Sequence, residues 1–185
     1  MVATPKVTGL NFMPALDQLN VRLAKPEDAA TIESFSAAMA LETEGRCLDL
    51  DRLHLGTTAL IENPAQGFFI VAEQGQGDNR QLLGQLMVTY EWSDWRNGAF
   101  WWIQSVYVAP AWRCQGVFRR MHESVLAAAR TRPNVCGVRL YVERRNNTAQ
   151  EVYRKVGLTP SSYAMFETDF VLSSLKGLED RPNEA

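Results

Sequence analysis

A glycine at the expected start of a helix is the first feature of this sequence that could do chemistry. Residues 106–125 read VYVAPAWRCQGVFRRMHESV, a β-type run followed by a turn and a helical pattern. The first N–H groups of a helix have no partner within it, and the helix dipole adds partial positive charge there. Gly116 would let a ligand approach those groups closely. The stretch therefore indicates either a cradle for a diphosphate or an ordinary strand-to-helix connection with solvated arginines, namely Arg113, Arg119 and Arg120.

A cradle at this position would differ from the two commonest phosphate-binding loops. A Walker loop ends in Gly-Lys-Ser/Thr, and a Rossmann fingerprint contains three spaced glycines. The sequence has neither pattern at this turn. The local sequence alone therefore leaves both interpretations of the turn open.

A second motif follows downstream, in VERRNNTAQEVYRKVGL at residues 142–158. It places Asn146, Ala149, Tyr153 and Gly157 at fixed offsets on a helix that follows a strand. Together, the two stretches resemble the GNAT superfamily of acetyl-CoA-dependent N-acetyltransferases. The downstream family pattern, Asn-x-x-Ala-x-x-x-Tyr-x-x-x-Gly-Phe/Leu, is met in full. The order of predicted elements also matches, so the resemblance covers roughly residues 19–171.

The upstream family loop, Arg/Gln-x-x-Gly-x-Gly/Ala, is matched only in part. Arg113 and Gly116 agree with it, whereas Phe118 stands where the family has a small residue. Phe118 still supplies a backbone N–H, so we expect its side chain to point away from the cofactor and into packing.

The resemblance implies that acetyl-CoA is the co-substrate and that no metal takes part. In the family, the loop amides bind the pyrophosphate, and the strand before the loop separates from its parallel neighbour to admit the pantetheine arm. Asn146 matches a family position that contacts the cofactor, although it could equally cap its helix. The implied cofactor-binding residues are Val106, Tyr107, Val108, Arg113, Cys114, Gln115, Gly116, Val117, Phe118, Arg119 and Asn146.

The implied reaction is direct attack of a primary amine on the thioester within a ternary complex. Tyr153 matches the family tyrosine that protonates the departing thiolate, and the alternative is a core-facing helical aromatic. Trp102 and Tyr141 occupy positions where relatives carry a glutamate base. A base must therefore come from elsewhere, with Glu91 as one candidate, or water carries the proton away.

The acceptor side is expected to be acidic and aromatic. Two loops, ETEG at residues 42–45 and EWSDWRNG at residues 91–98, are expected at the same end of the domain. Such a surface would attract a cationic primary amine, either a small molecule or a side chain, with Glu91 as base or steering residue. The alternative is a solvated hairpin tip. The remaining candidate acceptor residues are Glu42, Glu44, Trp92 and Asp94.

These motifs need a framework of strands and helices to position them. Periodicity predicts strands at 21–24, 67–73, 82–92, 99–108, 135–142 and 161–172, and helices at about 25–40, 49–62, 115–130 and 146–157. An antiparallel meander followed by a strand–helix–strand unit indicates a mixed α/β sheet with helices on both faces. The GNAT resemblance implies about six or seven strands in a strongly twisted, mostly antiparallel sheet. The expected organisation is an irregular extension at 1–19, one domain at 20–172 and a polar tail at 173–185.

Composition narrows the class of protein further. A formal net charge of −2 does not favour a nucleic-acid binder, and no apolar run suits a membrane span or signal peptide. Three widely spaced cysteines favour a reducing cytoplasm. Both histidines, His54 and His122, are expected at the surface.

Two other functions remain open from the sequence. The chain could be a regulatory or interaction module that binds acyl-CoA without catalysis. Alternatively, it could be an acyltransferase that uses another acyl-CoA. Many members of the family dimerise, so the resemblance also allows a homodimer.

Overall fold

The computed structural model describes residues 19–171 of the 185-residue chain, apart from the side chain of Asp78. The predicted tail and all but Leu19 of the predicted extension lie outside the described residues. The helices and strands are β1 (Asn20–Leu23), α1 (Ala29–Glu44), α2 (Leu50–Glu62), β2 (Gly67–Gln74), β3 (Gln81–Ser93), β4 (Gly98–Val108), α3 (Val117–Arg130), β5 (Val135–Leu140) and α4 (Asn147–Lys155).

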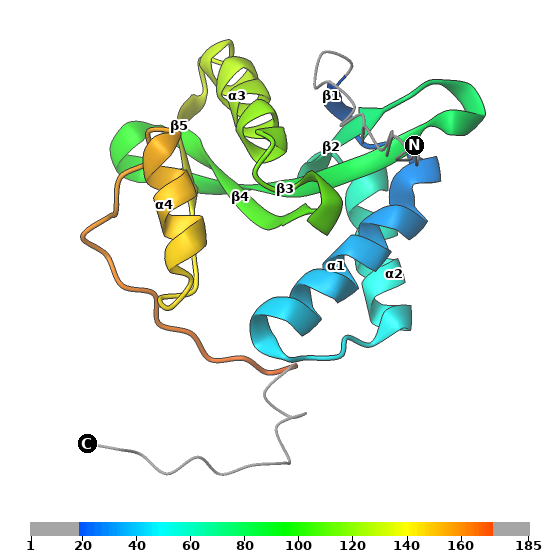
Figure 1. The fold of residues 1–185 in the computed structure, drawn as a ribbon. Helices are drawn as coiled ribbons and strands as arrows, with labels where there is room; N and C mark the ends of the chain where they lie inside the picture. Colours follow the sequence, from blue (N-terminus) through cyan, green and yellow to red (C-terminus); the bar gives the residue numbers. More distant parts are fainter. Residues whose placement is uncertain (1–18, 172–185) are drawn as a thin grey trace, which may run out of the picture.

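The strands form one mixed sheet in the order β1-β2-β3-β4-β5. Neighbouring strands are antiparallel except for β4 and β5, which are parallel. Figure 1 shows α3 on one face of this sheet and α1 with α2 on the other. The predicted mixed sheet with helices on both faces is therefore confirmed. Among the described residues the sheet has five strands, so the expected six or seven are not confirmed.

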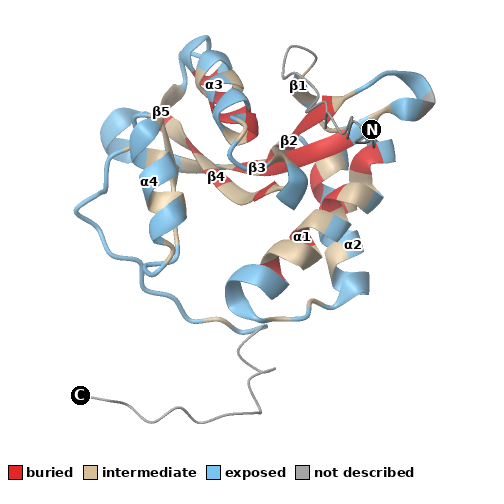
Figure 2. Cartoon of the chain, viewed as in Figure 1, coloured by how far each residue is buried: buried red, intermediate tan, exposed pale blue. Residues whose placement is uncertain are grey.

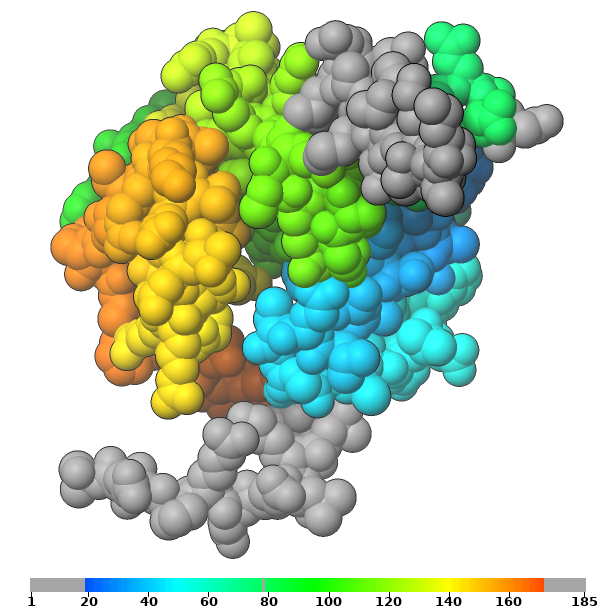
Figure 3. All heavy atoms as spheres, in the orientation of Figure 1, coloured from blue at the N-terminus to red at the C-terminus, as the bar shows by residue number. Residues whose placement is uncertain are grey.

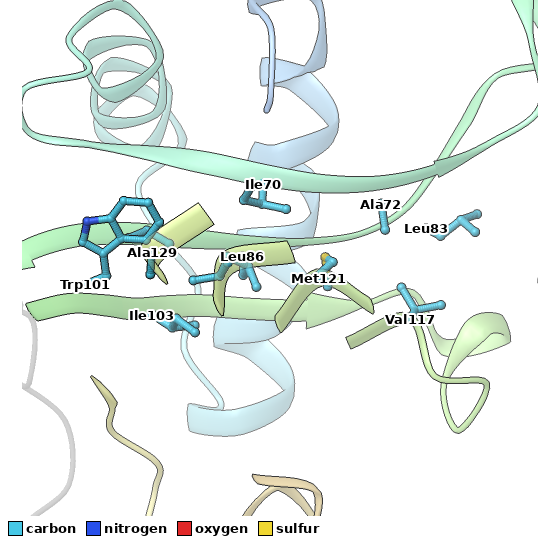
Figure 4. Packing of buried hydrophobic residues seen from close by; sticks show 11 residues of the cluster. Ile70, Ala72, Leu83, Leu86, Trp101, Ile103, Val117, Met121 and Ala129 are labelled. Atoms are coloured by element: carbon cyan, nitrogen blue, oxygen red, sulfur yellow. The ribbon is translucent and has the colours of Figure 1, made fainter. Parts of the chain in front are cut away.

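A hydrophobic core lies on each face of the sheet. The α3 face packs Val117, Met121 and Val125 of the helix against the strands, as their spacing by fours predicts (Figure 4). The opposite face packs Ile32 of α1 and Leu60 of α2 against β2 and β3. This double covering fixes the position of β4, the strand on which the candidate site depends.

Helix α1 ends later than the sequence predicts. The segment Leu41–Glu44 was expected to break the helix, but it continues it to Glu44. The stop is Gly45, which adopts the left-handed φ of 63° and donates its N–H to the Leu41 carbonyl at 3.1 Å. Glycine tolerates this conformation without a Cβ clash, whereas the residues before it are ordinary helix formers.

The predicted last strand, residues 161–172, is not formed within 161–171. A strand needs a neighbour to satisfy its backbone groups, and none of the described strands pairs with this segment. Helix α4 begins after Asn146, whose side chain accepts a hydrogen bond from the Ala149 N–H at 3.0 Å. Asn146 therefore caps α4.

Candidate functional site

The sheet opens at the end of β4. Pairing between β4 and β5 stops at Ile103 and Leu140, yet β4 continues to Val108 alongside β3. Ser105 has a left-handed φ of 49° and coincides with a register shift in the β3–β4 ladder. The edge of β4 at residues 104–108 therefore faces no strand on the β5 side, and we call this opening the notch.

Backbone groups of β4 point into the notch. The Ala109 N–H donates to the Leu83 carbonyl of β3 at 2.9 Å. Because successive peptide groups of a strand alternate in direction, those of Val106 and Val108 face away from β3. These are the two residues expected to pair with the pantetheine arm, although the Val108 carbonyl already accepts a hydrogen bond from the Arg113 Nε at 2.9 Å.

The N-terminus of α3 opens next to the end of β4. Gly116 caps the helix with a left-handed φ of 84°, and a Cβ added there would meet nothing within 4 Å. The first i to i−4 hydrogen bond runs from the Arg120 N–H to the Gly116 carbonyl at 3.0 Å. The N–H groups of residues 117–119 therefore lack such a partner and are available to an anion.

A hollow of about 330 Å³ lies beside the start of α3. Its lining consists of Gln115, Gly116, Arg119, Arg120 and Glu123. Arg119 forms an ion pair with Glu123 at 2.8 Å, whereas no ion pair of Arg120 is found among the described residues. Arg120 is therefore the cation best placed to meet an anionic ligand here.

The other residues of the loop lie around the start of α3. Cys114 is exposed and left-handed at φ 61°, and the Gln115 amide donates to the Ala111 carbonyl at 2.7 Å. Val117 is buried in the core, so only its backbone can face a ligand. The buried Val117 side chain thus anchors the start of α3 in the core.

Arg113 turns away from the hollow. Its guanidinium forms an ion pair with Glu42 at 2.7 Å, and its Nε donates to the Val108 carbonyl at 2.9 Å. The Tyr107 hydroxyl donates to the same Glu42 carboxylate at 3.1 Å, with the Arg113 guanidinium over its ring. This network ties the end of α1 to the end of β4.

Phe118 and Tyr153 join α3 to α4. Their ring centroids lie 5.4 Å apart, edge to face. The Phe118 ring thus packs toward α4, as expected for a side chain at this loop position. Burial raises the pKa of the Tyr153 hydroxyl, and that hydroxyl makes no hydrogen bond to any described residue. A protonated, unpaired hydroxyl is consistent with a proton donor.

His122 was expected at the surface, and the structure shows that this prediction is wrong. The side chain is 1% exposed, its ring lies 5.8 Å from that of Phe118, and its Nε2 has no hydrogen-bond partner among the described residues. Burial lowers its pKa, so the ring is neutral. His122 follows Met121 on the helix, so the buried face of α3 is wider than the row of residues spaced by four, Val117, Met121 and Val125. His54 is exposed and contacts Glu33 at 2.9 Å.

The two acidic loops do not meet. Glu42 bonds to Tyr107, whereas Glu91 is paired in register with Phe100. Seven residues of extended strand span roughly 20 Å. Glu91 forms an ion pair with Arg139 at 3.1 Å, and that guanidinium lies 3.6 Å from the Phe100 ring centroid.

The other hairpin residues are also distant from the notch. Trp92 is exposed, and the Asp94 carboxylate accepts a hydrogen bond from the Trp95 N–H at 2.9 Å within its own turn. Burial, with the charges of Glu44 and Glu167, raises the pKa of Tyr141, the residue after β5, so Glu44 lies on that side of the domain. The end of α1 therefore lies near the end of β4, while the β3–β4 hairpin does not.

A furrow crosses the surface where these elements meet. Figure 3 shows it between α4, in yellow to orange, and the bright green segment after β4, with the cyan end of α1 below. The furrow links the start of α3 to the end of α1. A long ligand could therefore reach both sides of the domain.

The chain belongs to the GNAT acetyltransferase family. The model for the acetyltransferase (GNAT) family matches residues 33–158. The crystal structure of a possible acetyltransferase from Clostridium difficile 630 is 36% identical, with a TM-score of 0.76 over 84% of this chain and 99% of the other. Members of this family use acetyl-CoA, and their reaction is an acyl transfer.

Two more distant structures share the fold. A predicted acetyltransferase with acetyl-CoA from Clostridium acetobutylicum is 17% identical, with a TM-score of 0.65 over 81% of this chain and 96% of the other. AAC(6')-Iy in complex with the bisubstrate analogue CoA-S-monomethyl-acetylneamine is 12% identical, with a TM-score of 0.61 over 82% and 97%. No curated protein matches the chain.

Residues 19–171 contain neither a metal cluster nor a membrane-spanning helix. No group of three or more His, Cys, Asp or Glu side chains in that range is arranged to hold a metal ion. None of the helices in the same range combines the length and the apolar character that a membrane span requires.

Proposed function

We propose that the protein transfers an acetyl group from acetyl-CoA to a primary amine. The observation that carries this proposal is the notch, which opens directly beside the free N-terminus of α3. A strand edge without a neighbouring strand and a helix start whose N–H groups lack helical partners suit a ligand that has an amide-containing arm and a diphosphate.

The chain's residues fit acetyl-CoA at this position. Space above Gly116 is open, and Arg120 adds an unpaired charge beside the N–H groups of residues 114–119. The backbone of Val106 and Val108 faces the notch, where the arm would lie. When bound, acetyl-CoA supplies the acetyl thioester.

The reaction would have three requirements: a polarised carbonyl, a proton for the departing sulfur, and loss of a proton from the amine. A backbone N–H of β4 would polarise the carbonyl that the amine attacks. As the carbon–sulfur bond breaks, the Tyr153 hydroxyl would give its proton to the sulfur. The attacking amine would lose a proton to water. A tyrosine hydroxyl is protonated at neutral pH, the form that this role requires, and burial raises the pKa of Tyr153 further.

The acceptor would enter from the end of α1. Glu42 and Glu44 lie on that side, and Glu42 already balances the charge of Arg113. Glu44 contacts Arg46 at 3.7 Å but stays largely exposed, so it is the freer carboxylate for a cationic amine. Glu91 remains a candidate for steering the acceptor from a distance.

A thiol-release assay with acetyl-CoA and a panel of primary amines tests the proposal. The expected result is amine-dependent release of the free thiol. Gly116→Glu should abolish both release and acetyl-CoA binding, since it fills the cradle and adds like charge. An acyl-CoA-binding module would instead bind acetyl-CoA, measured by calorimetry, and release no thiol with any amine. Release with a longer acyl-CoA alone would favour a different acyl donor.

A further inference from the structure

A second hollow, of about 450 Å³, lies among the end of β1, the end of α2, the start of β2 and the later part of α3, and we call it the groove. Within residues 19–171 it shares no lining residue with the hollow at the start of α3. Ala128 lines the groove and lies roughly 18 Å along the helix from Gly116, because a helix rises about 1.5 Å per residue. The groove is therefore separate from the position proposed for acetyl-CoA.

The lining of the groove is mostly apolar. Phe68, Tyr90 and Trp101 form an aromatic cluster in it, with the ring centroids of Phe68 and Trp101 5.1 Å apart, edge to face. The ends of β1 and α2 add aliphatic side chains, of which Leu23 is 58% exposed. Helix α3 contributes the small side chain of Ala128, which leaves space in the groove. Sites for small molecules are usually concave and apolar, with volumes of about 300–1,000 Å³, so the groove suits a small ligand.

The charge along the groove is positive. Among the described residues, its lining contains Arg22 and Arg132 but no Asp or Glu. Arg22 is balanced by ion pairs with Asp28 at 2.7 Å and Glu73 at 2.6 Å. In contrast, the Arg132 guanidinium forms no ion pair or hydrogen bond with a described residue, and it lies 5.6 Å from the Trp101 ring centroid. Arg132 is therefore an unbalanced cation beside the aromatic cluster.

Tyr90 gives a second indication of where Arg132 lies. Burial raises the pKa of the Tyr90 hydroxyl, and the Arg132 charge opposes this rise, so the guanidinium acts on that hydroxyl. The hydroxyl donates to the Pro64 carbonyl at 3.3 Å, so its proton is already engaged. Arg132 is thus the charged group that could recognise an anion in the groove.

We propose that the groove binds a free medium-chain carboxylate, with the alkyl chain along the apolar lining and the carboxylate on Arg132. The aliphatic and aromatic lining favours burial of a chain, and the unbalanced guanidinium complements one negative charge. The volume is in the lower part of the usual range, which fits a single chain of about eight carbons better than a lipid with two chains. This site lies outside the proposed acetyl transfer and does not depend on it.

Equilibrium dialysis of the full chain with labelled octanoate tests the proposal, and labelled 1-octanol serves as the uncharged comparison. Octanoate should bind to one site, and 1-octanol should bind more weakly because it lacks the charge. Saturating acetyl-CoA should leave octanoate binding unchanged. Absence of octanoate binding at millimolar concentration, or its displacement by acetyl-CoA, would overturn the proposal.

A substitution on α3 locates the binding. Ala128→Phe should abolish octanoate binding, because the larger side chain fills the groove. Ala127→Phe is the matched control, since Ala127 is the neighbouring exposed alanine of α3 and does not line the groove. Circular dichroism should show that both variants are folded. Octanoate binding that survives Ala128→Phe would place the ligand elsewhere and contradict the proposal.

A second substitution tests the role of charge. Arg132→Gln should weaken octanoate binding about fivefold, as expected for an exposed ion pair, and should leave 1-octanol binding unchanged. Arg130→Gln is the control, because Arg130 is exposed at the end of α3 and does not line the groove. Equal affinity for octanoate and 1-octanol in the wild type, or unchanged octanoate binding in Arg132→Gln, would show that the groove does not select a carboxylate.

Discussion

The middle of the sheet, at β2 and β3, and its β5 end are packed very differently. Around β2 and β3, Val71, Leu83, Leu86 and Val88 are completely buried. By contrast, every residue of β5 is only half-buried, and α4 has no buried residue (Figure 2). Tyr153, the proposed proton donor, belongs to the loosely packed side.

A buried ion cluster adds to the contrast. Arg22 of β1 contacts Asp28 at 2.7 Å and Glu73 of β2 at 2.6 Å, and the Asp28 side chain has no exposed surface. Regions with few buried contacts open at lower free energy than regions with a dense core. One side of the fold therefore supplies rigidity, while the other carries the proposed ligand site. Substitutions on the two sides should therefore have separable effects.

Tyr153→Phe should give the largest effect on turnover among substitutions on the loosely packed side, around β5 and α4. It removes only a hydroxyl, so turnover should fall about 100-fold to 10,000-fold, the usual contribution of general acid catalysis. Affinity for acetyl-CoA, measured by calorimetry, and the free energy of unfolding should hardly change. If turnover is unchanged, Tyr153 packs α4 and does not donate a proton.

Asp28→Asn should be the counterpart on the packed side. Leaving Arg22 without its buried partner should cost about 3–5 kcal/mol of unfolding free energy, measured by denaturant titration. Glu27→Gln in the same turn is the control, because Glu27 is exposed and should cost less than about 1 kcal/mol. Equal losses in both variants would show that burial of the cluster does not matter.

The same cluster predicts a dependence of stability on acid. Burial opposes the charge of Asp28, but hydrogen bonds from Arg22 and the Lys25 N–H outweigh it and lower the pKa of the carboxyl. The Arg22 hydrogen bond likewise lowers the pKa of Glu73 against the effect of burial. Both carboxyls ionise near pH 4 when unfolded, so their stabilisation is complete above about pH 4 and lost as pH falls through the lower folded values. Asp28→Asn should flatten this loss.

Phe118→Ala tests the ring contact with Tyr153, which joins α4 to α3. An aromatic pair contributes roughly 0.5–1.5 kcal/mol, so turnover should fall about tenfold or less as Tyr153 loses its support. The Michaelis constant for acetyl-CoA should change less, because the backbone N–H remains. Phe118→Leu should restore part of the turnover. An unchanged turnover in Phe118→Ala would exclude a positioning role.

The smallest effect is expected at the β3–β4 hairpin. Glu91 pairs with Arg139 at the surface, and such pairs contribute about 0.2–1 kcal/mol. Glu91→Gln should therefore raise the Michaelis constant for the amine by less than about fivefold, and Glu42→Gln should raise it more. The reverse order in steady-state kinetics would place the acceptor near the hairpin, as the sequence first indicated.

Much of the fold follows from periodicity in the sequence. The meander and the buried stripe of α3 are local patterns, because alternation and spacing by fours follow directly from strand and helix geometry. The start of α3 at Gly116 could be predicted because the glycine and the helical pattern are adjacent in sequence. The role of each cofactor residue remains a prediction.

Features that depend on distant partners could not be predicted. The pairing of Arg113 with Glu42 joins residues on different elements, and no local pattern indicates it. The burial of His122 depends on how α3 meets Phe118 and its surroundings. The segment 161–172 has the composition of a strand, but composition does not provide a neighbouring strand. The distance between the two acidic loops likewise depends on the length of β4, and no residue within the loops indicates it.

The notch also has a consequence for the order of folding. Strands β2, β3 and β4 are joined by short turns at Gly77–Asn79 and Asp94–Arg96, so their contacts are local. Ile103 pairs with Leu140, 37 residues further along the chain, and closing that loop costs more entropy. We expect the meander to be protected first in pulse-labelled hydrogen exchange and β5 to be protected later. A chain caught between these steps would already have most of its sheet, but it would have no opening for a cofactor.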